Sequence, residues 1–500
     1  MWPEPLGTGV RLLLGGHGAT RGPSVTAAPG PVVLCALADD PAHQRQYPTG
    51  WEPQEGNLLV AGIPGSGTTT ALCSAALSLA ASQDPDRVDF LFLDMGTRGL
   101  EPLTRLPHAR GYAGPGAAGR ELQNRLLRHL VEQMDARASD PGPHRDLYVF
   151  IDGFASLRDE FDDYEGNEVL QDFYQVWAKG PSLGIHCAAA TSRFKALPTA
   201  ISEVTTQKWL FQLADLYDYT GVGVARDAIP QPVPGRFVDG RSLHHAHIAT
   251  PDDLEEAVGA IGARWGAPRR PDLIGPLPKR LSPSQVGAAS VVAQEPWSIP
   301  VGVAESTLAP YALEAWSGEH LLVAGPSRSG KTSVLAAIAR KLDEDARASG
   351  TPLDIVGIAP RRSPLRLLVD APVHAPGEAA AALSAVLASP RPALVLIDDA
   401  HQVGDEGGML TALLSQPDPR ALVVAAGRND ELRTQYGQWT ALLRKSRLGL
   451  LLQPNVDVDG ELLGVRLPRR SPVALTVARG YACQSGMAAL VQAMPLSQEE

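Results

Sequence analysis

Two stretches decide the fold of this chain: "GNLLVAGIPGSGTTTAL" at residues 56–72 and "EHLLVAGPSRSGKTSVL" at residues 319–335. Each consists of an apolar run, a glycine-rich loop and the beginning of a segment rich in Ala and Leu. The residues upstream agree as well, because Trp51 precedes the first copy and Trp316 precedes the second. Self-similarity at so long a spacing indicates two duplicated domains and not a solenoid of short repeats.

Both copies continue as apolar runs that alternate with helical stretches. The runs occupy residues 88–94, 146–152 and 184–192 in the first copy and residues 353–359, 392–398 and 420–427 in the second. Residues 117–139 carry apolar side chains at helical spacing, and residues 377–389 are the matching stretch. Such alternation is typical of a buried parallel sheet. The chain is therefore predicted to be α/β, with two tandem P-loop domains, each a mainly parallel sheet flanked by helices.

Changes in composition give the expected domain boundaries. Residues 1–30 include "GGHGATRGPS" and are expected to form a flexible lead-in, whereas residues 266–297 are rich in Pro, Ser and Gly and are expected to form a linker. The first domain is predicted at residues 31–265 and the second at residues 298–495.

The bulk composition narrows the class of protein. A net charge of −11 over 500 residues counts mildly against wide contact with nucleic acid. The four cysteines lie far apart and form no CxxC pair, which favours reduced core cysteines over a metal cluster. No run approaches the ~18 apolar residues of a membrane helix, and the start lacks the basic region of a secretory signal. A cytoplasmic protein is expected, with any membrane contact made through a partner.

The second loop matches the phosphate-binding pattern G-x-x-x-x-G-K-[ST] in full. Its glycines permit a backbone whose N–H groups cradle phosphate, and the lysine reaches the β- and γ-phosphates of ATP. The threonine hydroxyl is expected to bind Mg²⁺. The nucleotide-binding residues predicted here are Gly325, Ser327, Ser329, Gly330, Lys331, Thr332 and Ser333.

Three further residues of the second copy are candidates for catalysis beside Lys331. Asp398 ends the apolar run of "ALVLIDDAHQV" and is expected to hold Mg²⁺ together with Thr332. Asp399 stands where a carboxylate polarises the attacking water in many such motors, although its other reading is a residue that supports the metal or caps the strand. Arg428 ends the next run and either contacts the γ-phosphate or a neighbouring subunit, or is a surface arginine; Arg193 matches it in the first copy.

The first copy keeps the shape of the loop and loses its charge. Thr68 replaces the lysine, and Gly153 follows Asp152 where the second copy has a second acid. Losing one charge-stabilising donor typically costs about 10²–10³ in rate, and here a base is missing too. The first copy should hydrolyse ATP very slowly or not at all, and weak nucleotide binding and an empty structural domain both stay open. The candidate binding residues retained here are Gly62, Gly65, Gly67, Thr68 and Thr69.

Two charged stretches carry weaker signals. Residues 158–166, "RDEFDDYEG", are expected to form a solvated acidic loop, with a metal site as the remote alternative. Arg444, Lys445 and Arg447 are expected to lie at a solvated helix end, with an arginine finger or a substrate contact as the alternative.

At this point the residues resemble a known family. The phrases "ALADDPAHQRQYPTGWEPQEGNLLVAGIPGSG", "VDFLFLDMGTRGLEPLTRLPHARGYAG" and "VLIDDAHQV" resemble the FtsK/SpoIIIE (HerA-FtsK) motor ATPases, and most of all the tandem C-terminal modules of EccC-type ATPases of actinobacterial type VII secretion. The resemblance implies RecA-like cores, ATP and Mg²⁺ as cofactors, and a ring or stack. Its catalytic roles carry over to Lys331 and Asp398 and not to Thr68 or Gly153.

The expected function is that of an ATP-hydrolysing motor component of a type VII-like protein secretion system, with an active second domain and a regulatory first domain. The resemblance implies a membrane-anchored motor subunit and small helical secreted proteins as partners. The alternatives are an FtsK-type translocase acting on double-stranded DNA, and a nucleotide-gated scaffold with little turnover.

Overall fold

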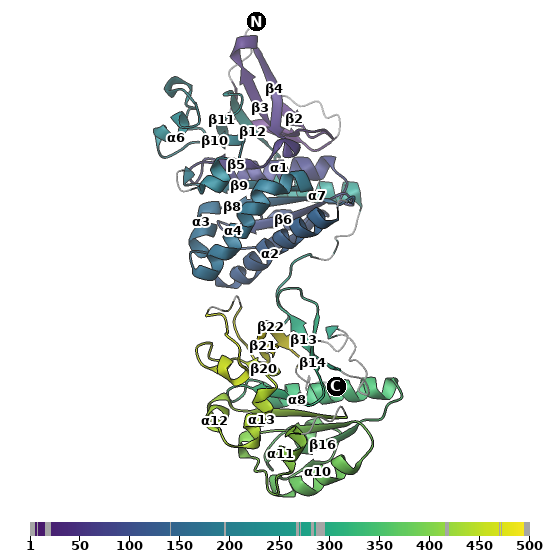
Figure 1. Ribbon diagram of the computed structural model, residues 1–500. Coiled ribbons are helices and arrows are strands. Elements are labelled where there is room, and N and C mark those ends of the chain that lie inside the picture. Colours follow the sequence, from purple (N-terminus) through teal and green to yellow (C-terminus); the bar gives the residue numbers. More distant parts are fainter. Residues whose placement is uncertain are drawn as a thin grey trace. The chain divides into compact units, whose positions relative to one another are not determined.

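The computed structural model of the chain divides into two compact units, Met1–Pro276 and Leu277–Glu500 (Figure 1). The structure describes residues 6–7, 9–15, 22–140, 142–194, 197–266, 270, 272–281, 285–286, 296–415, 420–469, 471 and 473–494.

Unit 1 is built on a twelve-stranded sheet whose centre is parallel. The path runs β2-β1-β12-β11-β10-β5-β9-β8-β6-β7, and the hairpin β3–β4 joins it through β12. Strands β10, β5, β9, β8, β6 and β7 pair in parallel, whereas β11, β12 and β3 pair in antiparallel fashion. The strands are β1 (Val10–Leu13), β2 (Ser24–Thr26), β3 (Val33–Asp40), β4 (Arg45–Trp51), β5 (Leu58–Ala61), β6 (Val88–Asp94), β7 (Ala109–Ala113), β8 (Asp146–Asp152), β9 (Ile185–Thr191), β10 (Gln207–Leu210), β11 (Arg236–Asp239) and β12 (His245–Thr250).

Helices cover both faces of this sheet, as the alternation of apolar runs predicted (Figure 1). One core lies under α1 and α7, and a second lies under α2, α3 and α4. The central strands are buried on both faces, which explains their continuous apolar sequence. The helices are α1 (Thr68–Ser82), α2 (Ala117–Ser139), α3 (Phe154–Glu160), α4 (Tyr164–Lys179), α5 (Thr199–Ser202), α6 (Leu216–Thr220) and α7 (Leu254–Trp265).

Unit 2 repeats the same plan with ten strands. Its sheet runs β14-β13-β22-β21-β20-β15-β19-β18-β16-β17, so that β15, β18 and β19 take the places of β5, β8 and β9. The strands are β13 (Trp297–Ala304), β14 (Pro310–Ala315), β15 (Leu321–Ala324), β16 (Asp354–Ile358), β17 (Val373–His374), β18 (Ala393–Ile397), β19 (Ala421–Gly427), β20 (Gly449–Leu452), β21 (Arg479–Gln484) and β22 (Met487–Ala493). The helices are α8 (Lys331–Ala348), α9 (Leu365–Leu368), α10 (Ala379–Ala388), α11 (Met409–Ser415), α12 (Asn429–Thr434) and α13 (Trp439–Lys445). The predicted fold class is confirmed in both units.

The expectation of a flexible lead-in over residues 1–30 is wrong for the part that the structure describes. Strand β1 pairs with β12 and with β2, and Val10, Leu12 and Val25 are buried in the core under α1. The glycine-rich stretch suggested disorder, but the short apolar run "VRLL" forms an additional strand of the sheet. Residues 1–5, 8 and 16–21 lie outside the described residues.

The expected linker, residues 266–297, is also partly ordered. Its first described residues contact unit 1, and its later ones belong to unit 2. Arg270 forms an ion pair with Asp89 of β6 at 2.6 Å, and the backbone N–H of Leu273 donates to the carbonyl of Arg110. Further along, Leu277 and Leu281 belong to a small core of unit 2. Apolar and charged residues spaced among prolines therefore anchor each end of the connection to its own unit. Residues 267–269, 271, 282–284 and 287–295 lie outside the described residues.

The two upstream tryptophans do not occupy equivalent positions. Trp51 ends β4 opposite Val33 and is fully buried, whereas Trp316 follows β14 and is 53% exposed. In unit 2 the corresponding pair is Trp297 with Ala315, so the buried tryptophan has moved to the other strand of the hairpin. A shift of one residue along a strand turns a side chain to the opposite face, which sequence alignment alone did not show.

Among the described residues, no helix is both long enough and apolar enough to cross a bilayer. All four cysteines are buried and free, and burial raises the pKa of each thiol to about 12.

Candidate nucleotide sites

The second phosphate loop joins β15 to α8 at the carboxyl edge of the sheet of unit 2. A Cβ on Gly325 would lie 2.5 Å from Ser329 Oγ and 2.8 Å from the carbonyl of Leu452, so only glycine fits there. Gly330 has φ +96°, a left-handed conformation that glycine adopts without strain. Arg328 also has a positive φ, of 63°, at the tip of the loop. The loop therefore has a fixed, compact backbone.

Lys331 is the first residue of α8 and folds back over this loop. Its Nζ donates to the carbonyl of Pro326 at 2.7 Å, and the residue is only 8% exposed. Burial lowers the pKa of Lys331, and the nearby carboxylates of Asp398 and Asp399 oppose that shift. The ammonium thus lies at the loop, where the sequence predicted a partner for the β- and γ-phosphates.

Thr332 and Asp398 meet at the metal-binding position that the sequence predicted. The hydroxyl of Thr332 donates to the two carboxylate oxygens at 3.0 and 3.3 Å. Asp398 is 2% exposed, and burial raises its pKa, against which the hydrogen bond from Ser363 acts. Ser363 Oγ donates to Asp398 Oδ2 at 2.5 Å. The sequence reasoning missed Ser363, which follows β16, the strand that pairs with β18.

Asp399 and Arg428 lie at the same edge of the sheet. Asp399 is half-buried and has φ +48°, so it leaves the line of β18 immediately after Asp398. Arg428 follows β19, the strand between β15 and β18, and therefore lies at the same edge of the sheet as the loop and Asp398. Its guanidinium forms an ion pair with Asp430 at 2.5 Å. The structure brings both candidates to the site, and their catalytic roles stay predictions.

The residues of unit 2 fit Mg²⁺ with ATP. The buried hydroxyl of Ser329 has no hydrogen-bond partner among the described residues, although it lies within the loop that would surround a phosphate. Lys331 supplies a positive charge beside it, and the N-terminus of α8 adds backbone N–H groups. Thr332 and Asp398 offer the oxygen ligands that Mg²⁺ requires. Ser327 and Ser333 belong to the same loop and helix start.

The first loop keeps the same backbone form. A Cβ on Gly62 would lie 2.4 Å from Ser66 Oγ, and Gly65 and Gly67 have φ of +83° and +107°. The hydroxyl of Ser66 is again buried, with no hydrogen-bond partner in the part of the chain that the structure describes. Thr69 repeats the role of Thr332, since its hydroxyl donates to Asp152 Oδ2 at 2.8 Å.

The charges of the first site differ from those of the second. Thr68 begins α1 and brings no ammonium, while Asp94 lies near Asp152 and adds to the effect of burial in raising its pKa. The carboxylate of Asp94 is fully buried and accepts backbone N–H groups of the loop that follows β6. Gly153 has φ +85°, the same left-handed region as Asp399, and carries no side chain. The site therefore lacks the ammonium of its counterpart, carries a carboxylate at Asp94 instead of one after Asp152, and offers no candidate base at residue 153.

Of the remaining charged candidates, Arg193 and Arg444 are engaged within the chain, whereas Lys445 and Arg447 are exposed at and beyond the end of α13, as predicted. Arg193 donates to the carbonyl of Ala155 at 3.3 Å and forms an ion pair with Asp159 on α3. Arg444 donates to the carbonyl of Gln435 at 2.6 Å at the end of α13. Lys445 and Arg447 follow on the same helix end and beyond it.

The prediction of a solvated loop at residues 158–166 is confirmed only in part: Asp159 and Asp162 are exposed, but α3 ends at Glu160 and α4 begins at Tyr164. Arg120 of α2 forms ion pairs with Glu160 and Asp163 at 3.2 and 2.7 Å, and its guanidinium lies over the ring of Phe161. Phe161 itself is buried. The acidic residues therefore attach this segment to α2 through Arg120. The buried ring of Phe161 adds packing that the charge pattern did not reveal.

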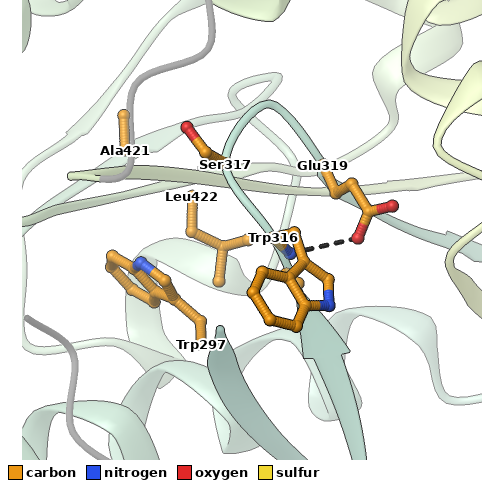
Figure 2. Close-up of a pocket in the computed structure, with 7 residues that line it drawn as sticks. Trp297, Trp316, Ser317, Glu319, Ala421 and Leu422 are labelled. Atoms are coloured by element: carbon orange, nitrogen blue, oxygen red, sulfur yellow. Dashed lines mark hydrogen bonds between the residues drawn. The ribbon is translucent and has the colours of Figure 1, made fainter. Parts of the chain in front are cut away.

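A pocket beside Trp316 is separate from the nucleotide site (Figure 2). It is lined by Trp297, Leu422 and Glu319 among others, and the backbone N–H of Trp316 donates to Glu319 Oε2 at 3.0 Å. Leu422 is near the start of β19, whereas the phosphate loop lies at the other end of these strands. This pocket is not where a nucleotide would bind.

The fold and the two loops define two tandem P-loop domains, one with a complete and one with an altered phosphate-loop sequence. The model of the FtsK/SpoIIIE family matches residues 40–193. The chain is 30% identical over 325 residues to the ESX-1 secretion system protein EccCb1 of Mycobacterium tuberculosis, a match that covers 57% of this chain and 54% of that protein. It is 25% identical over 341 residues to the ESX secretion system protein YukB of Bacillus subtilis, covering 62% of this chain and 22% of that protein.

Solved structures show the same fold. EssC (ATPases 2 and 3) from Geobacillus thermodenitrificans matches with a TM-score of 0.76 and 20% identity, covering 99% of this chain and 100% of that one. Thermomonospora curvata EccC (ATPases 2 and 3), in complex with a signal sequence peptide, matches with a TM-score of 0.69 and 21% identity, covering 93% of each chain. Residues 40–193 thus match the FtsK/SpoIIIE family, and the chain is similar to the EccC and EssC secretion ATPases, as its sequence indicated. It spans about half the length, or less, of the curated relatives that it matches.

Proposed function

We propose that unit 2 binds and hydrolyses ATP with Mg²⁺ and that unit 1 regulates it. The observation that carries the proposal is the convergence of Lys331, Thr332 and Asp398 in one buried cluster, against Thr68 and Gly153 in unit 1. Lys331 would hold the β- and γ-phosphates, and Thr332 and Asp398 would hold Mg²⁺, which neutralises charge on the transferred phosphoryl group. Asp399 is the candidate to orient the attacking water.

The test is a pair of matched substitutions at the first residue of each loop helix. Lys331→Ala removes the ammonium and should lower ATP turnover by about 10²-fold or more, because a charge-stabilising donor is lost from the site of transfer. Thr68→Ala alters the equivalent position in unit 1 and should change turnover far less. Unchanged phosphate release by the Lys331→Ala protein would sink the assignment of the working site to unit 2.

A groove on unit 2 supports a second part of the proposed function, the binding of a helical protein segment. In unit 1, α7 packs against α1 and the 3₁₀ turn Glu101–Arg105, with Val258 and Ile261 buried beneath it. Trp265 Nε1 donates to the carbonyl of Ala80, and Arg105 forms an ion pair with Glu255. This helix follows β12, the strand equivalent to β22.

In the described part of unit 2, no helix follows β22. The surface equivalent to the seat of α7, between α8 and α9, is a groove of about 300 Å³ in which Leu367 is 90% exposed. Its lining residues are Ala336, Ala339, Arg340, Asp343, Ile355, Leu367, Leu368, Val369, Asp370 and Ala371. Small apolar residues on the floor with charges of both signs at the rim suit an amphipathic helix like α7. One arginine against two aspartates does not suit the phosphate backbone of DNA.

We therefore propose that the groove binds the helical signal segment of a small secreted protein, as the related EccC structure was solved with a signal sequence peptide. The similarity to ESX secretion proteins supports two further parts of this proposal: a membrane-anchored motor subunit as a partner, and assembly into a ring. DNA translocation is the weaker candidate, since the net charge of −11 repels a duplex.

A labelled peptide with the sequence of α7 is a direct probe of the groove. It should bind to the intact protein, and Leu367→Asp should weaken the binding at least tenfold, because a desolvated carboxylate would then face the apolar side of the helix. Leu243→Asp, at another exposed leucine on unit 1, is the control. Fluorescence anisotropy would measure both affinities. Equal binding by the wild type and the Leu367→Asp protein, or competition by duplex DNA, would count against this occupant.

A further inference from the structure

In each unit an arginine stands between the phosphate loop and the segment on which the chain enters that unit. In unit 2 the backbone N–H of Ala478 donates to the carbonyl of Ser329 in the loop, at 2.8 Å. The next residue, Arg479, is 4% exposed, and its guanidinium donates to the carbonyls of Leu277 and Pro278 at 3.0 and 3.4 Å. Two consecutive residues therefore connect the phosphate loop to the entry segment.

Unit 1 contains the same arrangement. The backbone N–H of Gly235 donates to the carbonyl of Ser66 at 2.8 Å. Arg236 follows and donates to the carbonyls of Leu6 and Gly7 at 2.7 and 3.1 Å. Leu6 is buried, as Leu277 is, so each entry segment is fixed by one apolar side chain and one arginine.

The arginine and its hydrogen bonds to the entry segment recur in both units, whereas the residue that pairs with the arginine across the sheet differs. Across the sheet Arg236 pairs with His247 and Arg479 pairs with Gln492, and each guanidinium contacts that partner through Nε, at 3.5 and 3.0 Å. The residue before each arginine has a positive φ, +84° at Gly235 and +58° in unit 2, where it is an alanine that pays steric strain for this conformation. Both units thus adopt this turn, and in both units the turn contacts the phosphate loop.

We propose that Arg479 is a positioning residue that couples nucleotide binding at the phosphate loop of unit 2 to the docking of Leu277 and Pro278. A phosphate bound in the loop fixes the peptide between Ser329 and Gly330, and Ala478 holds that same peptide from behind. A buried guanidinium must keep its hydrogen bonds, so a shift of the loop is passed to the entry carbonyls. The coupling is reciprocal, because linkage acts equally in both directions. It rests on the proposed nucleotide binding by unit 2.

The first experiment needs no nucleotide. Hydrogen exchange is measured on the full chain for peptides that cover residues 325–331. Leu277→Ala releases the entry segment, and Arg479→Met removes the connecting donors; both should speed exchange in the loop. Leu6→Ala is the matched control, which should speed exchange at residues 62–67 of unit 1 and leave residues 325–331 unchanged. Unaltered loop exchange in both unit 2 variants would overturn the coupling.

The second experiment adds a slowly hydrolysed ATP analogue with Mg²⁺. In the wild type, the analogue should slow exchange at residues 277–281 as well as in the loop. Arg479→Met should weaken its binding by a factor of about 5–150, the usual range of such couplings, and Arg479→Lys should recover part of that loss because a cationic donor remains. Protection of the loop without protection of residues 277–281 would overturn the proposal. If the analogue does not bind while Leu277→Ala still loosens the loop, the proposed function is wrong and the connection between loop and entry segment stands.

Discussion

At the scale of single residues, Thr68 removes charge from a loop whose backbone form is unchanged. The space at Gly62 and at Gly325 is closed by the serine of the same loop, so both loops adopt one shape. What differs is the ammonium of Lys331 and the carboxylate of Asp399, which Thr68 and Gly153 replace in unit 1, and the carboxylate of Asp94, which unit 1 adds.

This contrast predicts the effect of Thr68→Lys. The new ammonium would face the carboxylates of Asp152 and Asp94 and compensate their charge, so nucleotide affinity in unit 1 should rise, by about tenfold for each 1.4 kcal/mol gained. Turnover should change little, because Gly153 supplies no base. The measurement is titration with a fluorescent ATP analogue in a Lys331→Ala background, in which unit 2 no longer contributes. Turnover restored to the wild-type rate would show that the base lies elsewhere.

Sequence motifs located the residues whose spacing along the chain is fixed. Lys331 and Thr332 follow from the loop pattern, and Asp398 from its place at the end of an apolar run. Ser363 and Arg479 could not be found in this way, because each acts through a residue that is distant in the sequence and that only the folded chain brings close. Arg428 was placed at the correct edge, but its ion pair with Asp430 depends on side-chain conformation, which no motif records.

At the scale of elements, long buried strands were predicted and short edge strands were not. The runs at 88–94 and 146–152 coincide with β6 and β8, because a strand buried on both faces must be apolar throughout. Strands β1 and β2 have four and three residues and gain their stability from distant pairing with β12 and with each other. Local composition carries little information about such pairing, and the glycines nearby pointed to disorder.

The residue that precedes the central strand β15 leads to a prediction about how stability depends on pH. His320 precedes β15, is buried, and accepts the backbone N–H of Val423 through Nδ1 at 3.3 Å; burial lowers its pKa from 6.5 to about 4. Between these two pH values the unfolded chain binds one more proton than the folded chain does. The free energy of unfolding should therefore fall as pH falls from 6.5 to 4, by up to about 3 kcal/mol from this residue.

Unit 1 supplies the matched substitution. Asn57 occupies the equivalent position before β5, and its Oδ1 accepts the backbone N–H of Cys187 at 2.8 Å. His320→Asn should keep the acceptor, cannot be protonated in this range, and should flatten the loss of stability of unit 2 between pH 6.5 and 4. Urea unfolding at several pH values would measure it, as a difference from the wild type so that other titrating groups cancel. His186, whose pKa burial also lowers to about 4, leaves the acid sensitivity of unit 1 in place as the internal control. An identical slope in both proteins would contradict this role of His320.

At the scale of the whole molecule, each unit has its own hydrophobic cores. The buried clusters of residues up to Ile274 belong to unit 1, and those from Leu277 onward belong to unit 2. Since burial of apolar surface is the main favourable term in folding, each unit can unfold as a cooperative body of its own. The duplication that the sequence revealed is therefore expected to appear as two thermal transitions.

Nucleotide should then shift one transition and leave the other in place. Binding to the folded state stabilises by RT ln(1 + [L]/Kd), about 2.7 kcal/mol at a hundredfold excess over Kd, and that amounts to about 5–10 °C for a unit of this size. Calorimetry with a slowly hydrolysed ATP analogue and Mg²⁺ should raise the midpoint of unit 2 by this amount, and Lys331→Ala should abolish the rise. The substitution His320→Asn identifies which transition belongs to unit 2, because only that transition responds to it at pH 5. A comparable shift of both midpoints would show that the acidic first site binds nucleotide as tightly as the second, and unit 1 would then act as a second nucleotide-bound unit and not as an empty partner.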